Sequence, residues 1–162
     1  MNHPVGRMFD MRLLFAAALA CASIASGACA GPFDGVWSIT FGCDENSSPL
    51  CRERPDSFSL TLWSTGRNLC GNKVATAYGQ NKIEEDDGDD PTIIGKSAGA
   101  RAIVTFTDSE GGSGRARLSL RGRQLGWHII ALTQGTGGDD YLPQDAVLTR
   151  SGPKPAGLGG CP

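Results

Sequence analysis

The chain has 162 residues, with 15 Lys and Arg against 17 Asp and Glu, which gives a formal net charge of −2. This length suits one domain with a modest core. A mildly acidic chain has no overall electrostatic attraction for nucleic acid or for an anionic membrane, so any electrostatic function must come from local patches of charge.

Residues 1–30 have the pattern of a secretory signal peptide. Arg7 and Arg12 precede an apolar run over residues 13–20, and Ala-Cys-Ala at residues 28–30 supplies the small side chains that a signal peptidase recognises. Polar residues and a glycine interrupt the apolar run before it reaches the roughly 20 residues that a membrane span needs. We therefore predict cleavage after this leader and no transmembrane anchor.

The leader also predicts the compartment. An alanine-rich leader is typical of bacterial export, so we predict the periplasm, with release outside the cell as the alternative. A lipid anchor is not expected, because Ala18 and Ser26 stand three places before Cys21 and Cys29, where lipoprotein signals carry a large aliphatic residue.

The predicted mature domain, residues 31–162, keeps four of the six cysteines: Cys43, Cys51, Cys70 and Cys161. An even number in a small exported domain predicts two disulfides, for which three pairings exist. We favour Cys43–Cys51, which closes a short polar loop. Its complement, Cys70–Cys161, ties down a Gly- and Pro-rich tail at residues 151–162 that would otherwise fray.

Apolar and polar side chains alternate along this domain with the period of a strand that has one buried face. The pattern is clear in five segments: 36–41, 58–63, 102–107, 115–120 and 125–130. It is weaker in three more: 72–78, 92–96 and 146–150. Residues 64–68 and 120–124 are typical of tight hairpin turns, and no helical period extends over 11 residues.

These segments predict an all-β fold, a small antiparallel up-and-down barrel of about eight strands stapled by two disulfides. Closure removes the exposed sheet edges on which other chains can pair. A barrel of this size is either filled by side chains or holds one small ligand. The side chains expected to face inward include these five: Trp37, Leu60, Val104, Leu118 and Trp127.

The two ends of the predicted barrel carry a tryptophan and an arginine. Gly35-Val36-Trp37 opens the first strand, and Arg150 closes the last. This arrangement resembles the calycins, the lipocalin and fatty-acid-binding barrels, in which such an arginine packs across the indole. The resemblance implies that Arg150 stacks on Trp37 at the base of the barrel, and that the interior carries a small apolar ligand. The alternative is an ordinary core tryptophan and a surface arginine.

A basic ladder of Arg115, Arg117, Arg121 and Arg123 crosses one predicted hairpin, with the first three on one face. As a functional site, the ladder would dock an acidic partner, because guanidinium groups grip carboxylates and steer their approach. The alternative is a solvated barrel exterior, neutralised by the acidic run at residues 84–90.

Trp63 falls on the outward phase of its strand. An exposed tryptophan is typical of a binding hot spot, which makes it a candidate binding residue. The competing interpretation is that a bulge near Gly66 turns the ring inward.

Two loops differ from tight turns. Residues 84–90 hold six carboxylates around one glycine, and residues 134–140 are glycine-rich and end in Asp139 and Asp140. The acidic run does not match the spacing of an EF-hand, so we interpret it as an exposed loop and not as a calcium site. It could also serve an inhibitor by entering the basic cleft of an enzyme.

Residues suited to catalysis are few. His128 is the one histidine of the predicted domain and lies on the polar side of its strand, where it is expected to be exposed. No nucleophile-elbow motif is present. Asp139 and Asp140 are adjacent, and adjacent strand residues point to opposite faces. We therefore predict no enzyme, no cofactor and, because Cys-x-x-Cys pairs are also lacking, no metal.

The sequence favours an exported, non-enzymatic protein that binds an envelope or extracellular protein, of inhibitor or immunity type. The alternative is a calycin-like carrier or sensor of a small apolar ligand. A hydrolase of envelope polymers ranks third, and nucleic acid is not an expected partner.

Overall fold

The computed structural model describes residues 30–44, 49–85, 90–109, 111–134 and 142–162. The described chain is all-β, with one short helix. In chain order the elements are β1 (Gly35–Thr40), α1 (Pro49–Glu53), β2 (Ser57–Thr65), β3 (Asn68–Ala77), β4 (Lys82–Glu85), β5 (Ile93–Ala98), β6 (Arg101–Thr107), β7 (Ser113–Arg121), β8 (Gln124–Gln134) and β9 (Asp145–Gly152). The predicted leader and both Asp139 and Asp140 lie outside the described residues.

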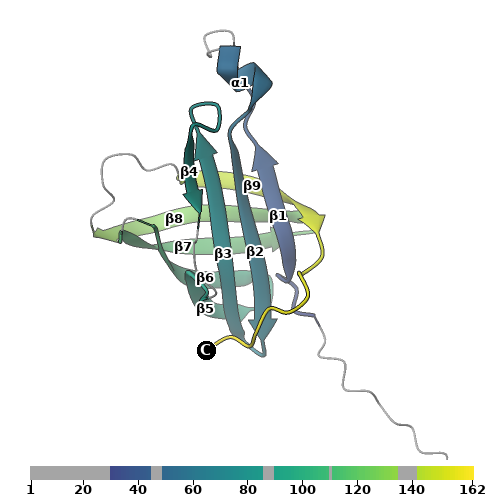
Figure 1. Cartoon of the computed structure of the whole chain (residues 1–162). Coiled ribbons are helices and arrows are strands. Elements are labelled where there is room, and N and C mark those ends of the chain that lie inside the picture. The colour runs from purple at the N-terminus through teal and green to yellow at the C-terminus, as the bar shows by residue number, and fades with distance from the viewer. Residues whose placement is uncertain (1–29, 45–48, 86–89, 110, 135–141) are drawn as a thin grey trace, which may run out of the picture.

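Eight antiparallel strands close into a barrel, as predicted. The strand order is β2-β1-β9-β8-β7-β6-β5-β3-β4, and an additional β2–β3 pairing completes the ring, leaving β4 outside it. In Figure 1, β1, β2 and β3 run across the front and cross β5 to β8 behind them at a steep angle. Helix α1 lies beyond one end of the barrel, and the C-terminus lies at the other.

Glycines make the tight hairpins. Three hairpins have two-residue loops that begin with a glycine at a φ of +61° to +63°: Gly66, Gly99 and Gly122. A type II′ turn requires a positive φ at this first position, and its twist matches that of the flanking strands. The loops at Gly66 and Gly122 are those predicted from the sequence.

The barrel axis is filled by large side chains. All five residues predicted to face inward are buried in one cluster. Trp127 lies at its centre, with its ring centroid 5.4 Å from those of both Phe58 and Phe106. Burial of each such side chain contributes about 1.5–3 kcal/mol, so this cluster is the main source of stability.

Strand β4 is the main departure from the predicted fold. Strand β3 pairs with β5 over Asn68–Gly71 and then with β4 over Val74–Ala77. β4 overlaps the start of the acidic run, which the sequence assigned to a loop. Helix α1 has five residues and so falls below the length at which a helical period can be recognised.

Both predicted disulfides are present. Cys43–Cys51 joins residues 8 apart in the sequence, next to α1, whereas Cys70–Cys161 joins residues 91 apart. The second bond holds the end of the tail against the outer wall of the barrel.

Candidate partner-binding face

Cationic side chains gather on the outer face of β5 to β8. Strand register places Arg101 of β6 opposite Ser119 of β7, and Ser119 opposite Gly126 of β8. One row away, Lys96 of β5 and Arg117 of β7 flank Ile103. We call the following exposed residues the basic face: Lys96, Arg101, Arg115, Arg117, Arg121 and Arg123.

The arginines of the basic face have no partner within the described chain. None of the five guanidinium groups forms an ion pair or a hydrogen bond with a described residue. Three of them alternate along β7, where side chains two residues apart stand about 7 Å from one another. Such a row of like charges is stabilised by an approaching anion.

The structure also shows which basic residues the sequence analysis missed. Arg101 and Lys96 were not among the predicted site residues. The alternation that puts Ala102 inside the barrel already implies that Arg101 points outward, so extending the predicted strand by one residue would have found it. Lys96 joins the face only through the β5–β6 register.

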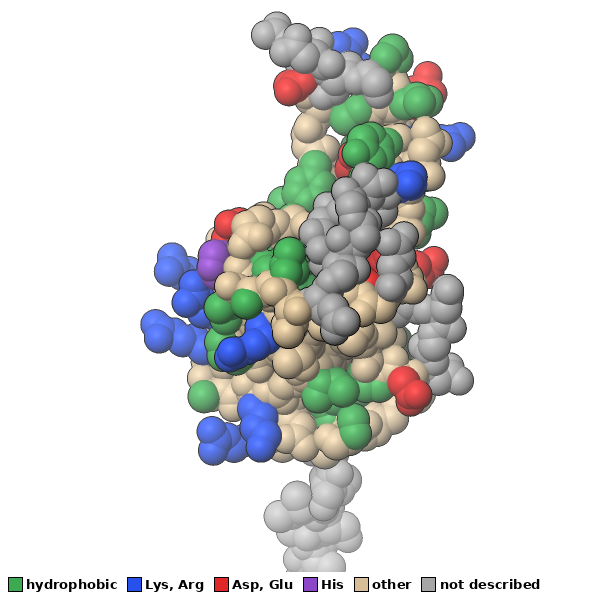
Figure 2. All heavy atoms as spheres, turned by 90° about the vertical axis from the view of Figure 1, so that its left-hand side faces the viewer, with side chains coloured by type: hydrophobic (Ala, Val, Ile, Leu, Met, Phe, Trp, Pro, Cys, Tyr) green, Lys and Arg blue, Asp and Glu red, His purple; other side chains and the backbone are tan. Residues whose placement is uncertain are grey.

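Exposed apolar side chains lie among these cations. Four of the eight large apolar residues exposed in the described chain point outward from β5, β6, β8 and β9: Ile94, Ile103, Ile130 and Val147. Figure 2 shows the blue Lys and Arg side chains grouped on this side of the barrel, with green apolar side chains beside them. A mixture of arginine and apolar surface is typical of protein–protein interfaces.

A groove of about 950 Å³ crosses the basic face. Its cationic lining comes from Arg101, Arg117 and Arg121, and its lining also includes Ser119 and Gly126. Gly126 of β8 has no side chain, which leaves space in the groove between the side chains of β7 and β9.

His128 borders this groove and is only partly exposed. Its side chain is 40% exposed, and Nδ1 lies 2.6 Å from Oδ1 of Asp145 on β9. His128 thus lies on the outward side of its strand, as predicted, and strand pairing brings the carboxylate of Asp145 opposite it.

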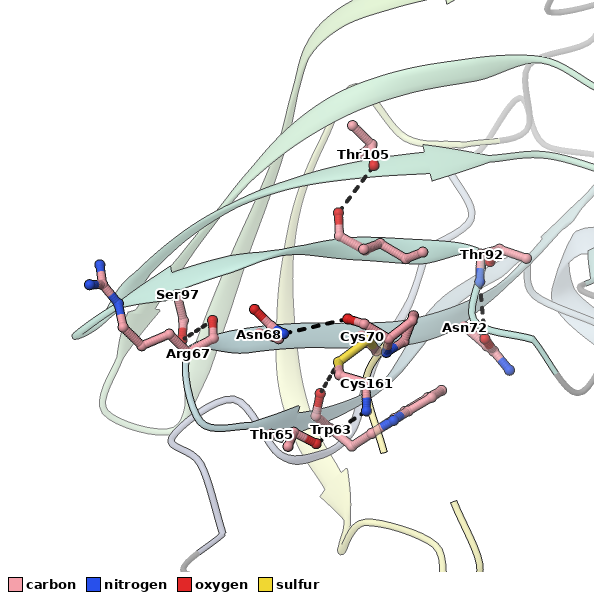
Figure 3. The surroundings of a disulfide bond; sticks show 12 residues. Trp63, Thr65, Arg67, Asn68, Cys70, Asn72, Thr92, Ser97, Thr105 and Cys161 are labelled. Carbon is pink, nitrogen blue, oxygen red and sulfur yellow. Dashed lines mark hydrogen bonds between the residues drawn. A yellow bond between two sulfur atoms is a disulfide. The ribbon is translucent and has the colours of Figure 1, made fainter. Parts of the chain in front are cut away.

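Trp63 is not an open binding residue. It is 3% exposed, although its neighbour Leu62 faces the core and alternation directs Trp63 to the outside. Cys70 lies opposite Trp63 on β3, and its disulfide brings Cys161 Sγ to 3.9 Å from the Trp63 carbonyl oxygen. Figure 3 shows Trp63 beside Cys161. The Cys70–Cys161 disulfide and the end of the tail therefore lie beside Trp63, whose ring neither contacts solvent nor turns inward at Gly66.

Arg150 and Trp37, at the two ends of the predicted barrel, lie against each other. Arg150 Cζ is 4.5 Å from the centroid of the Trp37 ring, and its Nη2 donates to the carbonyl of Pro32 at 3.0 Å. Gly35, at φ +137°, lets the backbone of β9 pass close to the start of β1, since a Cβ there would lie 2.9 Å from the carbonyl oxygen of Gly152. The contact fastens the segment before β1 to the end of β9.

Arg150→Met is expected to lower the free energy of unfolding by about 1 kcal/mol, because it removes an exposed cation–π contact and one hydrogen bond. Urea unfolding of the oxidised protein measures this. Arg123→Met removes an exposed arginine whose side chain has no described partner, and it should change the free energy of unfolding by less than about 0.5 kcal/mol. Equal effects of the two substitutions would contradict the role of Arg150.

A buried ion pair lies on the opposite side of the barrel from the groove. Lys73 is 0% exposed and faces Leu60 across the β2–β3 ladder, so it points inward. Its Nζ donates to Glu84 Oε1 at 3.1 Å. The same carboxylate accepts the backbone N–H of Ser109 at 2.8 Å and its hydroxyl at 2.5 Å.

The acidic run is thus not one exposed loop. Glu84 is buried in β4 while Glu85 is exposed, and residues 86–89 lie outside the described chain. The sequence signal for this pair was a lysine on the inward phase of β3. The predicted strand starts at residue 72, so too few residues precede Lys73 to show which face of the strand carries it.

In the described ranges, no three His, Cys, Asp or Glu side chains form a group that could hold a metal ion. None of the helices in these ranges is long and apolar enough to span a membrane.

No family model, curated protein or solved structure matches the chain.

Proposed function

We propose that this is an exported, non-enzymatic barrel protein that binds an acidic partner protein through the basic face, as inhibitor and immunity proteins bind their targets. The observation that carries the proposal is a set of five arginines without a described partner, four on the outer face of β6 and β7 and Arg123 in the adjoining β7–β8 turn. Carboxylates on a partner would neutralise these charges through bidentate hydrogen bonds.

The surroundings of the arginines support a protein as the partner. Apolar side chains exposed by 43% to 55% lie between and beside the cations, so a partner can bury apolar surface at the same time. Arginine is also enriched among the residues that dominate binding energy. Two disulfides support a site of action outside the cytoplasm, where such bonds persist.

Charge reversal on the basic face tests the proposal. Immobilised wild-type protein is exposed to envelope extract, and each retained protein is then purified and titrated calorimetrically. Arg115→Glu/Arg117→Glu should weaken the affinity by at least about tenfold, because two attractive charges become repulsive. Raising the salt concentration should also weaken it, since exposed charges are screened.

A matched variant separates the face from overall charge. Arg52→Glu/Arg54→Glu changes two exposed arginines at α1, far from the basic face, and alters net charge equally. This variant should keep wild-type affinity. Equal binding by all three proteins, or equal loss in both variants, would refute docking on the basic face.

A carrier of a small apolar ligand is the second candidate. The closed eight-stranded barrel and the Arg150–Trp37 contact favour it, whereas the side chains on the barrel axis disfavour it. Quenching of tryptophan fluorescence by laurate at micromolar concentration would support this function.

A further inference from the structure

The groove over Gly126 has a cationic end built around one serine. Arg117 and Arg121 stand two residues before and after Ser119 on β7, and Arg101 lies opposite it on β6. By register, arginines are thus the neighbours of Ser119 on three sides, and Gly126 is its neighbour on the fourth. Such an arrangement offers an anion several charge-assisted hydrogen bonds at once.

The other end of the groove is apolar. Beyond Gly126 it is lined by Val147 and Ala146 of β9 and reaches Ile39. The exposed apolar side chain at this end is Val147, which is 55% exposed, whereas Ala146 and Ile39 pack toward the core.

One carboxylate borders the groove, and it is paired. Asp145 contacts His128, while the three arginines have no such neighbour in the described chain. The charged side chains that line the groove therefore carry a net positive charge, and the three arginines are the neighbours of Ser119.

We propose that this groove is the anchoring site for the partner, and that it binds an acidic segment followed by an apolar side chain. This inference rests on the proposed function and specifies the chemistry of the partner. Ser119 on β7, Gly126 on β8 and Val147 on β9 stand in register, so Ser119 and Val147 are two strand spacings apart, about 10 Å. An extended peptide covers this span in about three residues. The segment should therefore place aspartate or glutamate about three residues from a leucine or phenylalanine.

The probe is the peptide acetyl-Asp-Asp-Gly-Leu-Phe-amide, added to full-length, oxidised, isotopically labelled protein and followed by NMR. The backbone amide signals of Ser119 and Gly126 should shift and saturate. Arg117→Ala should weaken binding about tenfold. Arg52→Ala removes an exposed arginine at α1, away from the groove, and should weaken it less than about twofold. A peptide with asparagine in place of aspartate should not bind.

A variant that fills the groove without changing charge gives a second test. A Cβ at Gly126 would clash with the Ser119 hydroxyl, 2.7 Å away, and would make an ordinary contact with the Ser119 carbonyl oxygen at 3.6 Å. Removing the hydroxyl in Ser119→Ala/Gly126→Val relieves the clash. This double variant should lose the peptide, and Ser119→Ala alone should retain most of the affinity.

Several outcomes would overturn the inference. These are undiminished binding by the filled variant, equal loss in Arg117→Ala and Arg52→Ala, no binding of the peptide to wild type, or equal occupancy by laurate or inorganic phosphate. In each case capture of a partner that depends on Arg115 and Arg117 would still support the proposed function. Binding of the peptide without any such capture would instead refute the proposed function.

Discussion

Glu84→Gln is expected to lower the free energy of unfolding by about 3–5 kcal/mol. The substitution keeps the shape of the side chain and an acceptor for Ser109, but it removes the carboxylate charge opposite Lys73, which is fully buried. Removing one partner of a buried ion pair costs about this much. Urea unfolding with the disulfides intact measures the change through the midpoint at constant slope.

Two controls identify the ion pair as the cause. Glu85→Gln removes the exposed neighbouring carboxylate and should change stability by less than about 0.5 kcal/mol. Lys73→Met/Glu84→Gln removes both charges and should recover most of the loss, because an apolar replacement often matches a buried ion pair. A double variant that is less stable than Glu84→Gln would show that the Lys73 charge is held by other groups.

Cys70→Ala/Cys161→Ala is expected to lower the free energy of unfolding by about 4–5 kcal/mol, since the bond closes a loop across 91 residues. The substitution also frees the tail that covers Trp63. The tryptophan emission should therefore shift to longer wavelength while the protein is still folded. A Trp63→Phe version of the same variant should not show that shift.

The short disulfide provides the comparison. Cys43→Ala/Cys51→Ala opens a loop between residues only 8 apart, so the expected loss is about 2–3 kcal/mol. Emission from Trp63 should not change, because this bond lies near α1, away from the tail. Equal losses in the two variants, or a Trp63 signal that responds to both, would contradict the assigned role of the tail.

The barrel itself could be predicted from local pattern. Trp37, Leu60, Val104, Leu118 and Trp127 were recognised as inward-facing because each alternates with polar neighbours. One face of a strand meets the core and the other meets solvent, so apolar and polar residues alternate along the sequence. The cysteine pairing was also predictable, since a short polar loop and a loose tail each need one bond.

The candidate site was predicted in part. Arg115, Arg117 and Arg121 share one face because they alternate on one strand, and no tertiary information is needed for that. Arg101 and Gly126 join them only through pairing with the neighbouring strands. The groove is a property of three strands in register, and its floor depends on which residue stands opposite Ser119.

By itself, the sequence determined eight of the nine strands, their buried faces, the favoured disulfide pairs and the basic hairpin, because the patterns behind them can be read from residues close in the chain. Only the tertiary structure decided that the side chains of Trp63, Lys73 and Glu84 are buried. The tail, held by a disulfide between residues 91 apart in the sequence, lies against the outward tryptophan. Strand β4, which lies outside the ring, supplies the carboxylate that pairs with a lysine inside the barrel. Burial of these groups depends on contacts between distant segments, which alternation along a single strand does not encode.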